Sequence, residues 1–241
     1  MMEFLIELRK QKRTGIIWIL IAVGIVGALY SLLNFGLRKD SLLGLPLPPM
    51  DILLTQLYGV VLIFNLFGVI MAACLIYQLE FKGQAVRKMY VLPITLTKYY
   101  LSKFVIVTGG LFMAIVLENA ALAKIGLTEL SQGAFDWPTL LRFAGYSFAT
   151  TLPVLTFMLL IAAHFENIWL PLGVGVIGFL TGLIFATVKP AIFLLHPFVL
   201  LFRPAVAMTA EVDPKIVVLL FGEAAIFLAA GLIATKKIRY V

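Results

Sequence analysis

The 241-residue chain is poor in charge and in cysteine. Asp, Glu, Lys and Arg together make up 13% of it, whereas soluble globular domains contain about 25% of these residues. Hydrophobic residues make up 62%, and the mean hydropathy is +1.07. One water-soluble core would not hide so much apolar surface, so the composition excludes an ordinary soluble protein. The single cysteine, Cys74, excludes a disulfide and a cysteine-based metal site within one copy.

The sequence also lacks the motifs of nucleotide and metal enzymes. No GxxxxGK[ST] phosphate loop and no HExxH pair occur, and no polar stretch is long enough for a nucleotide-binding domain. The two histidines, His164 and His196, are too far apart in the chain to predict a metal site. We therefore expect no cofactor in this chain, and any ATP would be handled by a partner.

Six apolar stretches are long enough to cross a bilayer, since a helix needs roughly 20 apolar residues to span the hydrocarbon. Charge inside them is limited to Lys103 and Arg142, close enough to span ends to snorkel, and to Glu118 and Glu223. The sequence thus predicts an all-α integral membrane protein with a single transmembrane domain over 1–241. The expected spans are 16–37, 53–77, 99–123, 140–163, 168–188 and 216–235.

A seventh apolar stretch, 191–202, is too short to cross. Pro190, Pro197 and Pro204 punctuate it. Irregular backbone at membrane depth persists only where protein or water covers it. We therefore expect a re-entrant or interfacial hairpin at 190–204, before the sixth span.

The distribution of lysine and arginine predicts the orientation. With a cytoplasmic N-terminus, twelve of the 19 basic residues fall in inner segments and seven in outer ones. Both termini are then cytoplasmic, and the net charge of +7 reflects this bias rather than nucleic-acid binding. Residues 1–14 predict an amphipathic elbow helix in the membrane surface, with Phe4, Leu5 and Leu8 on one face. The alternative is a charged anchor that only sets orientation.

A charged segment, QLEFKGQAVRKMYVLPITLTKYYLSK, separates the second and third spans at 78–103. Phe81, Ala85 and Met89 recur every four residues, which predicts a short amphipathic helix. Pro93 ends this pattern, and Thr97 can cap the helix that follows. The alternative is a basic loop that serves orientation alone.

This segment resembles the permeases of type-2 ABC exporters, in particular their lantibiotic-immunity branch, through Glu80, Gly83, Leu92-Pro93-Ile94 and Tyr100-Leu101-Ser102-Lys103. The elbow, the six spans, the hairpin before the last span and the short basic tail extend the resemblance over the full length. It implies a transport permease, not an enzyme, in the plasma membrane of a bacterium. The implied cargo is an amphipathic or antimicrobial peptide, with a lipid-like antibiotic or another small hydrophobic molecule as the alternative.

The resemblance also implies partners. Segment 79–97 would be a coupling segment docked on a cytoplasmic ABC ATPase subunit, which binds ATP and Mg²⁺. The family implies two copies of that ATPase and a second permease, identical or related. By carry-over, the coupling surface would consist of Glu80, Phe81, Arg87, Lys88 and Met89.

Two glutamates inside spans are candidate functional residues, because ionisable groups at membrane depth are rare and often functional. Counted from the expected span ends, Glu118 and Glu223 both lie in the outer third of the bilayer. We expect one or both to line a polar pocket that attracts a cationic peptide, with Asn65 as a further candidate on this path. The alternatives are protonated or helix-bonded carboxylates, and an interhelical hydrogen bond for Asn65.

Small residues mark two helix faces that can approach another helix closely. Gly175, Gly178 and Gly182 line one face of the fifth span, and Gly24 and Gly27 lie in the first. In the resembling family these two spans face the second permease, so the five glycines are candidates for that contact. The alternative is packing within one chain.

Two other classes of protein remain. An intramembrane enzyme needs paired carboxylates, a Ser/His couple or metal-spaced histidines at one depth. Glu118 and Glu223 could form a dyad, but no third group joins them. A membrane scaffold or sensor would have no ATPase partner, and co-purification would separate it from a permease.

Overall fold

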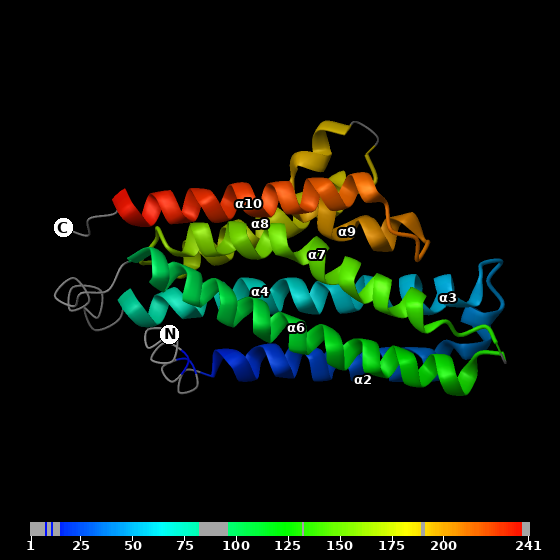
Figure 1. Cartoon of the computed structure of the whole chain (residues 1–241). Coiled ribbons are helices and arrows are strands. Elements are labelled where there is room, and N and C mark those ends of the chain that lie inside the picture. Colours follow the sequence, from blue (N-terminus) through cyan, green and yellow to red (C-terminus); the bar gives the residue numbers. More distant parts are fainter. Residues whose placement is uncertain are drawn as a thin grey trace.

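The computed structural model describes residues 8, 11, 15–81, 96–131, 133–188 and 191–237. These residues form helices and no strand, and the long helices run side by side in one bundle (Figure 1). The all-α prediction is therefore confirmed for this part of the chain. The elements are α2 (Ile16–Leu43), α3 (Pro49–Asp51), the π-helical turn η1 (Ile52–Gln56), α4 (Tyr58–Phe81), α6 (Leu96–Glu129), α7 (Trp137–Ala162), α8 (Trp169–Phe185), the 3₁₀ turn η3 (Ala191–Leu195), α9 (Pro197–Ala207) and α10 (Pro214–Lys237).

Five helices in the described part of the chain are long and apolar enough to cross a membrane. They are Ile16–Leu43, Pro49–Leu79, Thr97–Glu129, Trp137–Ala162 and Pro214–Thr235. Each extends past the span that the sequence predicts; α6, for example, continues from residue 123 to Glu129. Hydropathy detects only the part of a helix that lies in hydrocarbon, whereas backbone hydrogen bonding continues into the polar layer.

The fifth predicted span, 168–188, is shorter in the structure. Helix α8 has 17 residues, which corresponds to about 25 Å and is less than the roughly 30 Å of a hydrocarbon core. The chain then turns back, and His196 Nε2 lies 3.2 Å from Thr181 Oγ1 inside α8. A sixth full-length span is thus not confirmed, because part of the predicted apolar run is used for this return.

The predicted hairpin at 190–204 is, from residue 191 onwards, a 3₁₀ turn followed by helix α9, which continues to Ala207. Pro197 occupies the first turn of α9, where its missing N–H is not needed. α9 packs against α7 and α8, and Phe198 to Phe202 are all buried. Helix α9 is thereby covered by protein, whereas Ile192 and Leu195 of η3 are exposed. The re-entrant position of the hairpin in a membrane stays a prediction.

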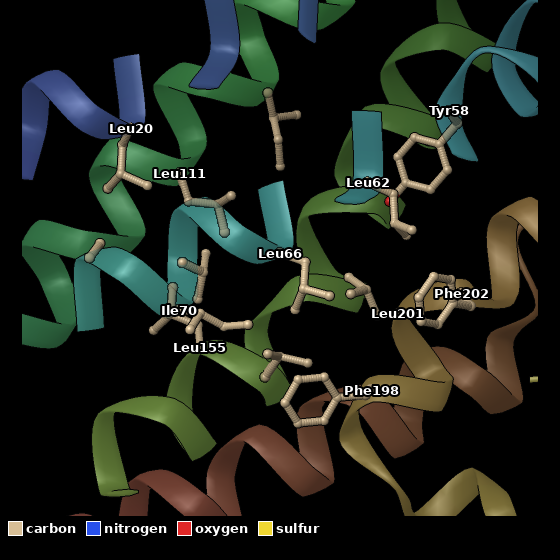
Figure 2. Packing of buried hydrophobic residues seen from close by; sticks show 14 of the residues in the cluster. Leu20, Tyr58, Leu62, Leu66, Ile70, Leu111, Leu155, Phe198, Leu201 and Phe202 are labelled. Atoms are coloured by element: carbon tan, nitrogen blue, oxygen red, sulfur yellow. The ribbon is translucent and has the colours of Figure 1, made fainter. Parts of the chain in front are cut away.

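Helices α4 and α7 form the centre of the bundle. Within their most apolar stretches, 61% and 67% of residues are buried, against 28% for α2 and 22% for α10. Figure 2 shows Leu66 and Ile70 of α4 among side chains from the neighbouring helices. Leu20 and Leu111 come from α2 and α6, and Leu155, Phe198, Leu201 and Phe202 come from α7 and α9. The core is therefore continuous from α2 to α9.

The second crossing begins irregularly, with α3 and the π-helical turn before α4. Pro49 stands in the first turn of α3. An Asp51 carboxylate oxygen accepts a hydrogen bond from the backbone N–H of Ala210 at 2.7 Å. This contact ties the start of the second crossing to the segment that follows α9.

Several predictions fall wholly or partly on residues outside the described part of the chain. Of the elbow 1–14, only Leu8 and Gln11 are described, and both are helical. Most of coupling segment 79–97, including Arg87, Lys88 and Met89, lies outside the described residues. So do residues 189–190 and 238–241.

Candidate functional site

The structure joins two of the three predicted path residues. Glu118 of α6 is 3% exposed and Asn65 of α4 is 2% exposed. Asn65 Nδ2 donates to Glu118 Oε2 at 2.9 Å. The other carboxylate oxygen, Oε1, and Asn65 Oδ1 have no hydrogen-bond partner among the described residues. The pair thus keeps unused acceptors in an apolar region, where an unpaired polar group is costly.

Helix α2 covers this pair because Gly27 has no side chain. A Cβ at Gly27 would stand 2.6 Å from Glu118 Oε1. One turn earlier, a Cβ at Gly24 would stand 2.6 Å from the Cα of Ala114 in α6. The two glycines therefore face their own chain. Close packing within one chain, the alternative that the sequence left open, is seen at both glycines, and contact of this face with a second permease stays a prediction.

Close packing within one chain is seen at the glycines of α8 as well. A Cβ at Gly175 would stand 2.8 Å from the side chain of Ile70 in α4. Gly178 and Gly182 both lie against Phe198 of α9. The glycine face predicted for a second permease is thus filled by α4 and by the returning helix.

A small polar cavity adjoins Glu118. It measures about 10 Å³, close to the size of one water molecule. Its polar lining comes from Ser31, Tyr58, Ser147, Glu118 and Asn119, which belong to four different helices. Asn119 Nδ2 donates to the carbonyl of Ile115 at 2.8 Å. We call Asn65, Glu118 and the polar residues of this cavity the polar cluster.

A large apolar groove lies between α6 and α7, on the other side of Asn119. Its volume is about 750 Å³. Along α6 it extends from Phe112 to Thr128, which corresponds to about 24 Å of helix. Trp137 and Lys124 lie toward the end of the groove where α6 ends and α7 begins, and Asn119 lines both this groove and the polar cavity. The α6/α7 groove therefore backs directly onto the polar cluster.

Glu223, the third path candidate, stands apart from this cluster. It lies in α10 and is 7% exposed, and neither of its oxygens has a hydrogen-bond partner in the described part of the chain. It does not line the polar cavity or the α6/α7 groove. Glu118 is eleven residues from the end of α6 and Glu223 is nine from the start of α10. These intervals correspond to about 16 Å and about 14 Å. The two glutamates thus lie at similar distances along their helices, although they line different parts of the structure.

The predicted coupling surface is described in part. Glu80 and Phe81 form the last two residues of α4, and Phe81 packs against the hydrophobic core. α4 ends and α6 begins at the end of the bundle where α2 begins and α10 ends (Figure 1). The two helices that flank the coupling segment are therefore adjacent, at this end, to the start of the first long helix and the end of the last one.

Lys103, predicted to snorkel, is instead fully buried. Its Nζ donates to the carbonyl oxygen of Ile76 at 3.2 Å and lies over the rings of Tyr77 and Tyr99. Arg142, in contrast, is exposed and donates to the carbonyl of Pro138 at 3.2 Å. Sequence reasoning missed the inward direction of Lys103, although the tyrosines beside it supply aromatic partners for an ammonium group.

No metal centre is formed by the residues that the structure describes, since no three His, Cys, Asp or Glu side chains gather there. The described residues offer an apolar groove between α6 and α7 with a buried carboxylate behind it.

Comparison with known proteins addresses the family. No curated protein and no solved structure matches the chain significantly. Residues 4–182, about three quarters of the 241, match the family model described as ABC-2 family transporter protein. The chain therefore belongs to the ABC-2 family of transporter proteins, the membrane permeases of ABC transporters.

Proposed function

We propose that this permease works in an ATP-driven exporter that expels amphipathic or antimicrobial peptides from the membrane. The observation that carries the proposal is the position of Glu118, buried directly behind the apolar α6/α7 groove with one oxygen unpaired among the described residues. An amphipathic peptide would place its apolar face in the groove. Its cationic side chains would be attracted toward the carboxyl group of Glu118.

A lipid-like antibiotic is the second candidate cargo. The lining of the α6/α7 groove favours it, because nearly all of the side chains there are apolar. Such a molecule needs no carboxylate. The two cargoes therefore differ in their dependence on Glu118.

The energy would come from a separate ABC ATPase, present in two copies and carrying ATP and Mg²⁺. Membership of the ABC-2 family supports such a partner. A second permease, identical or related, would complete the exporter in the plasma membrane, with both termini in the cytoplasm. Glu80 and Phe81, with Arg87, Lys88 and Met89, would then form the surface that docks on the ATPase.

Co-purification tests the partner. The permease should retain an ABC ATPase encoded beside it and should increase ATP hydrolysis when cargo is added to reconstituted vesicles. A permease that retains no ATPase would instead be a scaffold. Turnover of a membrane substrate without ATP would indicate an intramembrane enzyme.

Substitution of Glu118 tests the cargo. Glu118→Gln keeps the size and removes the ionisable carboxyl group, so export of a cationic amphipathic peptide should fall. Interactions with a charged group contribute about 1.5–3 kcal/mol, which corresponds to roughly tenfold or more in affinity. Glu129→Gln, at the exposed end of the same helix, is the matched control.

Two outcomes would separate the cargoes. Loss of peptide export with unchanged export of an uncharged lipid-like antibiotic would support a direct role of the carboxylate. Full export of both by Glu118→Gln would show that Glu118 has no part in transport.

A further inference from the structure

Lys103 is completely buried although it stands near the end of the bundle. α6 begins at Leu96, so Lys103 is seven residues into the helix, or about 10 Å along it. Lysines at such positions usually extend their ammonium group toward the interface. Here the side chain turns inward, toward the last turns of α4.

The ammonium group is surrounded by partners from both helices. Nζ donates to the main-chain carbonyl of Ile76 at 3.2 Å. It also lies 4.9 Å from the ring centroid of Tyr77 and 4.3 Å from that of Tyr99. Ile76 and Tyr77 belong to α4 and Tyr99 belongs to α6. Cation–π attraction is stronger when the cation is desolvated, as Lys103 is.

We propose that Lys103 is a positioning residue that locks the last turns of α4 to the first turns of α6. The bond to a main-chain carbonyl matters, because a carbonyl moves only when its helix moves. The two helices flanking segment 82–95 would then shift as one body when a partner displaces that segment. This role in energy transfer rests on the proposed ATPase partnership, whereas the lock itself does not.

Burial also argues against a simpler role. A lysine that only sets orientation would lie in the polar layer, with its charge available to the membrane surface. Placing an ammonium inside the protein is unfavourable unless partners compensate. The carbonyl and the two rings contribute to that compensation, and the carbonyl of Ile76 and the ring of Tyr77 link Lys103 of α6 to α4.

The lock is tested in the purified permease alone, by pulsed electron paramagnetic resonance between spin labels at Gln78 and Thr97. Cys74→Ala removes the native cysteine. We expect a narrow distance distribution for the parent and at least a roughly twofold broader one for Lys103→Met. Lys124→Met, an exposed lysine farther along α6, is the control and should leave the width unchanged. An equally narrow distribution for Lys103→Met overturns the lock.

A milder variant keeps the test decisive should Lys103→Met fail to fold. Tyr77→Leu retains the lysine and removes the ring that α4 contributes, so its distribution should broaden by less than that of Lys103→Met. An unchanged width in this folded variant also overturns the proposal.

Energy transfer is tested in vesicles that contain the permease and its ATPase. Lys103→Met should keep the ATPase bound yet reduce cargo-stimulated hydrolysis and export roughly tenfold, within the range typical of coupling between sites. A wild-type permease that binds no ATPase would refute the proposed partnership, while the spin-label result would still stand. Wild-type coupling that Lys103→Met leaves intact would refute only the role of Lys103.

Discussion

A close approach between α2 and α6 at Gly24 lets us predict how a substitution there changes thermal stability. A Cβ at Gly24 would lie 2.6 Å from the Cα and 2.9 Å from the carbonyl oxygen of Ala114. Both atoms belong to the backbone, so no side-chain rotation relieves the clash. Gly24→Ala must therefore push the two helices apart over part of their length.

Gly36, a second glycine of α2, provides a reference for the expected change in stability. Gly36 of α2 has nothing within 4 Å of an added Cβ. Gly36→Ala should show only the helix propensity gain of about 1 kcal/mol. Overpacking in a close-packed core costs typically about 1–3 kcal/mol. Gly24→Ala shares this propensity gain but adds the overpacking cost, and about 1 kcal/mol shifts Tm by roughly 2–4 °C in soluble domains of 150–250 residues. The Tm of Gly24→Ala should therefore lie several degrees below that of Gly36→Ala, which should itself rise slightly.

The assay can use the protein's own reporter. Cys74 is the single cysteine and is 2% exposed, so a thiol-reactive fluorescent dye should label it only on unfolding. Heating the detergent-purified permease with the dye gives Tm for each variant. A Gly24→Ala protein as stable as Gly36→Ala would refute the close approach. Loss of a permease dimer without a change in the Tm of the single chain would favour contact with a second permease at Gly24.

Three further results are expected. Gly145→Leu should reduce export of either cargo, because an added Cβ there meets nothing within 4 Å and the longer side chain would occupy the α6/α7 groove; Gly222→Leu, on an equally open position of α10, should not. Asp51→Ala should lower Tm and speed hydrogen exchange at the Ala210 amide, since a hydrogen bond to a charged group contributes about 1.5–3 kcal/mol and this one is 2.7 Å long. Lys39→Ala should leave Tm unchanged within error, because its ion pair with Glu129 is exposed and such pairs contribute little; a clear drop in Tm would show that this pair fixes α2 on α6.

The helical crossings could be predicted because membrane hydropathy is a strong signal. The apolar runs located α2, α4, α6, α7 and α10, whereas their ends were missed by up to six residues at Leu43 and Glu129. Charged residues such as Arg38 and Lys39 stop an apolar run without stopping a helix. Helix ends therefore need capping and tertiary contacts that a hydropathy pattern does not contain.

Which neighbour a glycine face packs against was harder to predict than where the helices lie in the sequence. The glycines of α2 and α8 correctly indicated close helix approach, but a small-residue face is the same for a neighbour in the same chain as for one in another chain. In the structure, the return of the chain to Thr181 places Phe198 on Gly178 and Gly182. It depends on contacts between segments that no local pattern encodes.

The sequence allowed some residues of the candidate site to be predicted, but not how they are arranged. Glu118 and Asn65 were visible as polar residues in apolar runs, yet their pairing needed the relative rotation of α4 and α6. The α6/α7 groove and the inward turn of Lys103 gave no sequence signal of their own. The shape of a groove and the direction of a side chain both arise from how helices pack, and amino-acid composition contains no information about them.

The glycine that lets α2 rest on the carboxylate has a mechanical consequence. Because Gly27 leaves no side chain between the helices, the α2 backbone itself seals Glu118 Oε1. An outward swing of α2 by about the width of a methyl group would admit water beside the acid, and a return swing would expel it. Hydration of this one oxygen would then follow the tilt of the first helix.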